Sequence, residues 1–417
     1  MHRAHQRATG SRGLWRWLLA AALAAGSVPD AGADPPARSQ PAGDQALSTD
    51  AILEHIHALG DDTMEGRGTG TPGGERAAAY IEERLAALGL EPAGDDGGYR
   101  QALPLHGSLP LAGSRLVLVG AAGTERPLTL WDDYVLFDSG AQTFVARPTP
   151  LVFAGYGIVA PEHDYNDYQN LDVGDHVAVF LAGEPPSEEP EFFDGPQPTI
   201  HSDPETKFRV ALARGARGAI LLPSPREHAF DDWRRVLAAF RSEDVTLPWG
   251  ISGNLDLAVS LERAPELFAG APHSFEEVLA LDEAGALPSF PLAVEASFAG
   301  DFRERDFVAH NLAARLPGSD PLLAGEHVLV SAHYDHLGIG MPVHGDTIYN
   351  GVVDNASGTA VVLELARALA ARPGGTRRSV LFLFVTAEEK GLLGSRYYRD
   401  HPLVPLHRTI AAVNVDG

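Results

Sequence analysis

The chain of 417 residues carries a formal net charge of −24 at pH 7, with 44% hydrophobic and 21% charged residues. This composition is typical of folded proteins, and the negative charge argues against nucleic acid or anionic membrane surfaces as partners. The absence of cysteine excludes disulfide bonds, a thiolate metal site and a cysteine nucleophile.

The first 33 residues are typical of a secretory signal. Arginines precede an apolar run over 17–28 that is too short to span a bilayer, and small residues follow at 31–33. We therefore expect an exported protein, periplasmic or extracellular, without stable membrane association after signal cleavage; an uncleaved anchor is the alternative. Residues 34–47 are rich in proline, alanine and polar residues and predict a linker.

Residues 48–107 predict two helices joined by a glycine-rich loop. Apolar residues recur at helical spacing over 52–59 and 77–88, and Gly89 marks the end of the second helix. The loop contains a Gly-x-Gly-x-x-Gly pattern, which in a dinucleotide site follows a buried strand. Because polar residues precede the pattern here, we interpret the loop as a plain entry turn to the second helix.

Residues 108–298 predict a separate, inserted domain that is mainly β. Short apolar runs alternate with glycine and proline, and 208–213 predicts a short helix that ends before Gly215. The runs that predict strands include 114–119, 150–153, 176–181 and 218–222.

From residue 299 to 417 the pattern is that of an α/β domain. Near-continuous apolar runs over 328–332, 380–386 and 410–415 are typical of strands buried on both faces of a parallel sheet. An amphipathic helix is predicted over 357–371. The predicted fold class is α/β, a mostly parallel central sheet flanked by helices, interrupted by the mainly β domain.

Metal-binding residue types follow each of these three strands. In an open α/β sheet, ligands bind beyond the carboxyl ends of the strands, so residues distant in sequence converge there. The candidates are His333 and Asp335 after the first strand, Glu388 and Glu389 after the second, Asp416 after the third, and Asp354 before the intervening helix. Imidazole and carboxylate groups suit zinc, and a pair of ions needs a bridging anion.

The spacing of these candidate residues indicates a different role for each. His333 and Asp335 are two apart and face the same side of an extended chain, so Asp335 can hold the imidazole. Glu388 and Glu389 are adjacent and face opposite ways, so one can bind metal while the other acts as general base. Each motif alone has a plain structural explanation, but their coincidence at three strand ends favours a metal site.

The segments that contain these residues are SAHYDHLG, YNGVVDNASGTA, FVTAEEKGLLGS and AVNVDG. They resemble the successive motifs of the family M28 metallopeptidases, the dizinc aminopeptidase group. Residues 60–92 are similar to the N-terminal portion of that family. Residues 150–183 and 206–222 are similar to the protease-associated domain that is often inserted there.

The resemblance implies the zinc exopeptidase fold, two zinc ions and a role for each candidate. By this resemblance His333 and Asp416 bind the first zinc, Glu389 binds the second, Asp354 bridges both ions, Asp335 orients His333, and Glu388 is the general base. It also implies a cis peptide bond between Asp354 and Asn355.

The chain departs from this family in one respect. The family's second zinc also takes a histidine from a strand end well after the Asp416 motif, whereas this sequence stops at Gly417, so we interpret it as C-terminally truncated. His336 and His344 are the nearest substitutes, but both are predicted on loops without a supporting pattern. We expect one zinc to bind well and the second poorly.

The expected function is that of a secreted, zinc-dependent exopeptidase, an aminopeptidase that hydrolyses peptide substrates by a metal-activated water. Two alternatives stay open: a non-catalytic, receptor-like member of the same fold, and a related carboxypeptidase or glutaminyl cyclase. Retention of both His333 and Asp354 favours two metals over one. The sequence leaves the residue specificity and the oligomeric state open.

Overall fold

The structure is a computed structural model that describes residues 47–417 apart from 138–139, 141–143, 227–232 and 252–253. The predicted signal and nearly all of the predicted linker lie outside the described residues. The chain divides into two compact units, whose described parts are His106–Val245 with Trp249–Arg305 (unit 1), and 47–105 with Thr246–Pro248 and Asp306–Gly417 (unit 2). No helix in the described part of the chain combines the length and apolarity that a membrane span requires.

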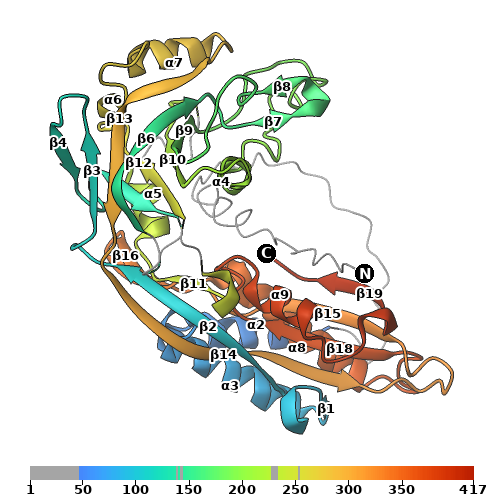
Figure 1. Cartoon of the computed structure of the whole chain (residues 1–417). Coiled ribbons are helices and arrows are strands. Elements are labelled where there is room, and N and C mark those ends of the chain that lie inside the picture. Colours follow the sequence, from blue (N-terminus) through green and yellow to red (C-terminus); the bar gives the residue numbers. More distant parts are fainter. Residues whose placement is uncertain (1–46, 138–139, 141–143, 227–232, 252–253) are drawn as a thin grey trace, which may run out of the picture. The chain divides into compact units, whose positions relative to one another are not determined.

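A seven-stranded sheet supports unit 2, with β18, β15 and β19 side by side (Figure 1). The strand order is β11–β2–β14–β18–β15–β19, with β1 paired to β14. The strands are β1 Glu91–Pro92, β2 Arg100–Pro110, β11 Asp244–Thr246, β14 Phe302–Leu316, β15 His327–His333, β18 Ser379–Val385 and β19 Thr409–Asn414. β15 is parallel to both β18 and β19, which confirms the predicted parallel core, whereas β14 is antiparallel to β18.

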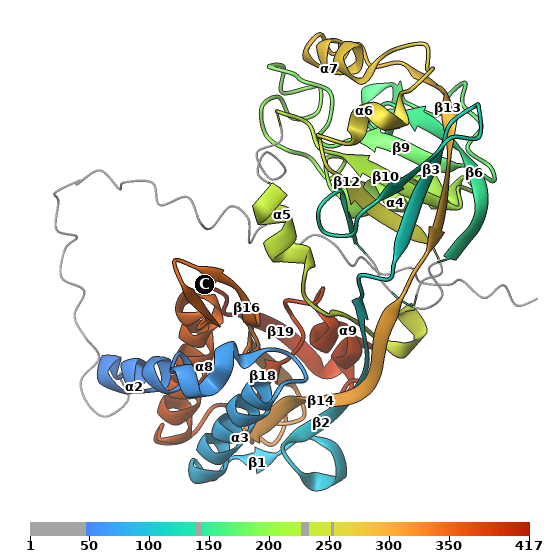
Figure 2. The same ribbon diagram turned by 90° about the vertical axis from the view of Figure 1, so that its left-hand side faces the viewer.

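Helices cover both faces of this sheet around β18 (Figure 2). They are α2 Thr49–Leu59, α3 Pro72–Ala87, α8 Gly358–Ala370 and α9 Leu393–Asp400. Alternate residues of β18 supply two apolar clusters: one packs against α2, α3 and α8, and the other packs against Tyr398 of α9. Every residue of β18 is buried, as predicted for a strand covered on both faces.

The two N-terminal helices form where the sequence predicts them. Ser48 caps α2 with its hydroxyl, and Thr71 caps α3, in which Pro72 occupies the first turn. Gly89 has φ +67° and donates its N–H to the carbonyl of Ala86, which confirms the predicted end of the second helix. A 3₁₀ helix, η1 Asp62–Arg67, precedes the glycine-rich loop in place of the strand that a dinucleotide site requires.

The prediction that 410–415 is buried on both faces is wrong for the described residues. β19 lies at the edge of the sheet and pairs with β15. Ile410 and Val413 remain 50% and 52% exposed. A continuous apolar run therefore predicted the strand and its direction here, but not its burial.

Unit 1 contains an eight-stranded sheet of order β4–β3–β13–β6–β9–β10–β12–β5. Its strands are β3 Arg115–Val119, β4 Glu125–Leu128, β5 Tyr134–Leu136, β6 Phe144–Ala154, β9 Val177–Leu181, β10 Gly218–Leu222, β12 Leu255–Val259 and β13 Ser289–Ala299, with β7 Val159–Ala160 and β8 Tyr165–Asn166 as a separate pair. Its helices are α4 Pro204–Ala213, α5 Trp233–Phe240, α6 Ala264–Leu267 and α7 Phe275–Glu283. All four predicted strand runs lie in β3, β6, β9 and β10, so the mainly β character of this segment is confirmed.

Candidate metal centre

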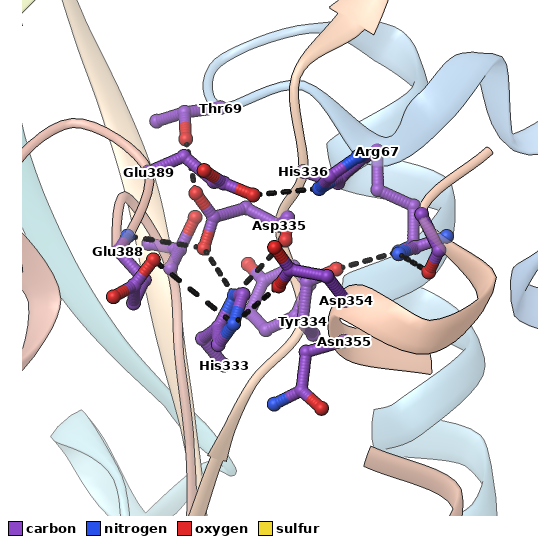
Figure 3. A network of polar contacts seen from close by, with 12 residues as sticks. Arg67, Thr69, His333, Tyr334, Asp335, His336, Asp354, Asn355, Glu388 and Glu389 are labelled. Atoms are coloured by element: carbon purple, nitrogen blue, oxygen red, sulfur yellow. Dashed lines mark hydrogen bonds and ion pairs between the residues drawn. The ribbon is translucent and has the colours of Figure 1, made fainter. Parts of the chain in front are cut away.

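The parallel strands of unit 2 bring the predicted ligands to one end of the sheet (Figure 3). His333 is the last residue of β15 and lies opposite Val385 of β18, and Asp416 follows β19. Asp354 lies in the short helical segment η5, Val352–Ser357, directly before α8. The structure therefore gathers residues that are up to 83 positions apart in the sequence.

The His333 imidazole is placed as a metal ligand would be. Its Nδ1 donates to the main-chain carbonyl of Asp335 over 3.1 Å, which leaves Nε2 facing the other side. Nε2 lies 3.1 Å from an oxygen of Asp354 and 3.1 Å from an oxygen of Asp416. Two ligands of one tetrahedral zinc lie about 3.3 Å apart, so these three donors fit a zinc ion with little movement.

The charge around His333 also suits a cation. Burial by itself lowers the pKa of this imidazole, but contacts with Asp335, Asp354 and Asp416 outweigh burial and raise the pKa far above its usual range. The hydrogen bond with His333 in turn lowers the pKa of Asp416. A group of carboxylates that retains a proton on histidine this strongly is equally suited to a divalent ion.

A second group of donors shares Asp354 with the first. One ligand atom each of His336, Asp354 and Glu389 lies within 4.8 Å of the others, as holds also for His333, Asp354 and Asp416. Asp354 is therefore placed where the family resemblance puts the bridging ligand. His344, the other histidine considered as a substitute, is exposed in the turn between β16 Gly338–Val343 and β17 Asp346–Tyr349.

Glu388 lies beside the first group without belonging to it. Its Oε2 is 4.0 Å from Nε2 of His333, and its Oε1 is buried without a hydrogen-bond partner among the described residues. Burial, together with the nearby carboxylates of Asp335 and Glu389, raises the pKa of Glu388 to about 8 against the opposite effect of His333. A buried carboxylate with one unpaired oxygen next to a ligand cluster is a feature of proton-transfer sites.

The side chains of Glu388 and Glu389 point in different directions, as predicted, but the backbone that carries them is not extended. Ala387 has φ +53°, and the two glutamates follow it in a turn. Glu388 is directed to His333, whereas Glu389 accepts a hydrogen bond from His336 (Figure 3). The turn, and not the alternation of side chains along a strand, therefore directs the two glutamates to different sides.

Asp335 supports several parts of the centre. One carboxylate oxygen lies 3.8 Å from Nδ1 of His333 and accepts the main-chain N–H of Glu388 over 3.1 Å. The other accepts from the hydroxyl of Thr69 over 2.9 Å. Asp335 thus fixes both the imidazole side of the centre and the turn that carries Glu388.

The peptide bond between Asp354 and Asn355 is cis, as the resemblance implied. The Asn355 side chain donates to the carbonyl of Val415 over 2.9 Å and accepts the N–H of Gly358 over 2.9 Å. These contacts connect the segment that carries Asp354 to the segment that carries Asp416 and to the start of α8.

Sequence reasoning missed Arg67 and Thr69, and it considered His336 only as a substitute ligand on a loop. Arg67 is completely buried, and its guanidinium donates to the carbonyls of Leu59, Tyr334, Asn350 and Gly351 at 2.6–2.8 Å. Burial lowers its pKa to about 10, against the carboxylates of Asp335, Asp354 and Glu389. The EGRGTG sequence is the available signal for Arg67 and Thr69, but its glycines by themselves indicate only a loop.

Comparisons with known proteins give relatives for this part of the chain. Residues 311–417 match the family model described as "Peptidase family M28". Aminopeptidase NAALADL1 of Mus musculus is 43% identical over 81 residues, which are 18% of this chain and 10% of that protein. Aminopeptidase YwaD of Bacillus subtilis is 42% identical over 74 residues, 18% of this chain and 14% of that protein. The matched segments thus span only about a tenth of these relatives.

Among solved structures, an aminopeptidase from Aneurinibacillus sp. strain AM-1 matches with a TM-score of 0.50 and 18% identity. The match covers 89% of this chain and 70% of that protein. At this identity the similarity shows a common fold.

Proposed function

We propose that this protein is an exported zinc-dependent aminopeptidase, because residues 311–417 match the model of peptidase family M28. The observation that carries the proposal is the convergence of His333, Asp354 and Asp416 on one point, with the buried, unpaired oxygen of Glu388 beside it. The relatives described above are aminopeptidases, which favours aminopeptidase over carboxypeptidase activity.

The proposed centre holds two zinc ions. His333, Asp354 and Asp416 would hold one, and Glu389 with Asp354 would hold the other. Zinc supplies the Lewis acid that polarises the scissile carbonyl and lowers the pKa of the attacking water. The carboxylates offset the positive charge of the ions, which fits the excess of acidic groups in the cluster.

Glu388 is the proposed general base. Its carboxylate takes a proton from the attacking water as the water oxygen bonds to the carbonyl carbon, and it delivers that proton to the leaving nitrogen as the carbon–nitrogen bond breaks. Its neighbour Asp335 holds the Glu388 main chain by a hydrogen bond and so fixes the base beside the ligands. A receptor-like protein of this fold would not need both the ligands and the base.

We further propose that unit 1 is an inserted domain of the protease-associated type, and that the signal in residues 1–33 exports the protein. The position of unit 1 between the two halves of unit 2 in the sequence supports the first proposal. The arginines and short apolar run of residues 1–33 support the second. The substrates are peptides.

A substrate panel tests this function. Leucine p-nitroanilide, its N-acetylated form and an N-blocked dipeptide with a free carboxyl terminus are offered to the protein with zinc, after chelation, and after zinc is restored. The proposal predicts zinc-dependent hydrolysis of the free-amine substrate alone. Hydrolysis of the N-blocked dipeptide with a free carboxyl terminus would identify a carboxypeptidase, and activity that survives complete removal of zinc would reject the metal mechanism.

A further inference from the structure

His336 and Glu389 form a buried pair at the proposed second zinc. Nδ1 of His336 lies 2.6 Å from Oε1 of Glu389, and the two side chains are only 9% and 2% exposed. With the imidazole proton on Nδ1, His336 donates to the carboxylate. The contact lowers the pKa of Glu389, although burial raises it overall.

The His336 ring has little freedom to turn. Its main-chain N–H donates to the carbonyl of Arg67, and the residue forms a β-bridge with Gly68. On another side Gly351, with φ +57°, lies so close that an added Cβ would be 2.4 Å from Cγ of the imidazole. The ring is thus fixed by the loop after η1 and by the segment before Asp354.

The spacing of His336 differs from that of His333. Two ligands of one tetrahedral zinc lie about 3.3 Å apart. His333 keeps 3.1 Å from each of its two carboxylates, whereas His336 approaches Glu389 to 2.6 Å. The shorter distance is that of a charge-assisted hydrogen bond, so the two histidines have different roles.

We infer that His336 is a positioning residue for the second zinc site, which holds Oε1 of Glu389 by a hydrogen bond and leaves Oε2 for the ion. This inference rests on the proposed function, because it needs a cation between Glu389 and Asp354. Hydrogen-bond partners of metal ligands fix ligand orientation, and their loss typically weakens metal binding 10–100-fold.

Two substitutions separate positioning from ligation. His336→Asn keeps an N–H donor near the place of Nδ1 but is a poor zinc ligand, whereas His336→Leu keeps the bulk and removes the donor. His407→Leu, at an exposed position of unit 2, is the matched control. The affinity for each of the two ions is measured by zinc titration against a competing chelator, and retained binding of the first ion shows that each variant is folded.

Positioning predicts that His336→Leu weakens the second ion 10–100-fold, that His336→Asn stays close to the wild type, and that His407→Leu changes nothing. If both His336 variants lose the second ion, His336 is a ligand of that ion. If His336→Leu binds the second ion with unchanged affinity, His336 has no role in zinc binding. Either result overturns the inference. A wild-type protein that binds no zinc rejects the proposed function itself, before any variant is compared.

Discussion

At the scale of single residues, Arg67 connects the parts of the chain that carry the ligands. Its guanidinium donates to the carbonyl of Tyr334, between His333 and Asp335, and to the carbonyl of Gly351, shortly before Asp354. A buried cation of this kind also offsets part of the negative charge of the centre. Its hydrogen bonds, more than its charge, explain why it tolerates complete burial.

Replacement of Arg67 by methionine should reduce the free energy of unfolding by at least about 3 kcal/mol, because several buried carbonyls lose their donor at once. Urea unfolding of the metal-free protein measures the change. The control is Arg399→Met, whose side chain is 56% exposed and pairs with Asp400, and we expect about 0.5 kcal/mol or less. Equal effects of the two substitutions would contradict the role given to Arg67.

Asp167 in unit 1 predicts a dependence of stability on pH. Burial raises its pKa to about 6, although hydrogen bonds from Ile158 and Tyr165 and the charge of Lys207 act against that rise. A folded-state pKa above the unfolded value means that the folded protein binds more protons between pH 4 and 6. Its contribution to stability is therefore largely present at pH 4 and falls, by about 2 kcal/mol, as the pH rises to 6.

Asp167→Asn should remove this part of the pH dependence, since an amide does not titrate while its oxygen can still accept from the main chain. Unfolding of unit 1 at pH 4 and pH 6 gives the comparison, with exposed Asp132→Asn as control. We expect the variant to lose less stability than the wild type between pH 4 and pH 6. If the free energy of unfolding changes equally with pH in Asp167→Asn and in the wild type, the pH dependence comes from other groups.

At the scale of elements, the segment before α8 depends on close packing at Gly351. A Cβ there would lie 2.4 Å from the carbonyl oxygen of Asp354 as well as from the His336 ring. Gly345, in the turn between β16 and β17, also has positive φ, but nothing lies within 4 Å of its added Cβ. Alanine substitutions at Gly351 and Gly345 therefore separate the free-energy cost of a positive φ, which both share, from the cost of steric overlap, which only Gly351 has.

We therefore expect Gly351→Ala to destabilise unit 2 by about 2 kcal/mol more than Gly345→Ala, and to weaken zinc binding as well. Chemical unfolding and zinc titration of both variants provide the measurement. If the two alanine variants are equally stable and bind zinc equally well, the segment does not depend on contact at Gly351.

The elements of unit 2 were largely predictable because their signals are local. The apolar runs before His333 and Glu388 mark buried strands, and parallel pairing then brings the residues after each strand together. The run that ends at Asp416 predicted its strand equally well, yet its burial depends on neighbours that no local pattern specifies.

The features that the sequence did not predict depend on contacts between distant residues. Arg67 donates to the carbonyl of Tyr334, 267 positions away, and nothing in its neighbours distinguishes a buried arginine from an exposed one. His336 lies on a loop without periodicity, and its partner Glu389 is 53 positions away. The turn at Ala387 requires a positive φ from a residue that rarely adopts it, so extended geometry was the natural expectation.

At the scale of the whole molecule, the two units have separate apolar cores. In unit 2 one cluster joins α2, α3 and α8 to the sheet and another joins α9 to its other face, whereas separate clusters lie within unit 1. All proposed metal ligands belong to unit 2. Bound zinc should therefore stabilise unit 2 selectively, because a ligand adds stability to the folded state that binds it.

Removal of zinc by a chelator should lower the thermal unfolding transition of unit 2 and leave that of unit 1 in place. At free zinc about 1,000 times its dissociation constant the stabilisation is about 4 kcal/mol. Differential scanning calorimetry with and without chelator measures both transitions. If the chelator lowers only the unfolding transition of unit 1, the metal site does not lie in unit 2.

The most direct test of the account is the turnover of Glu388→Ala together with its zinc content. We expect the variant to retain the zinc of the wild type, since Glu388 is not a proposed ligand, and to lose at least about 100-fold in kcat on leucine p-nitroanilide. Glu54→Ala, at an exposed position of α2, should match the wild type in both. If Glu388→Ala keeps its zinc and hydrolyses the substrate at the wild-type rate, Glu388 is not the general base.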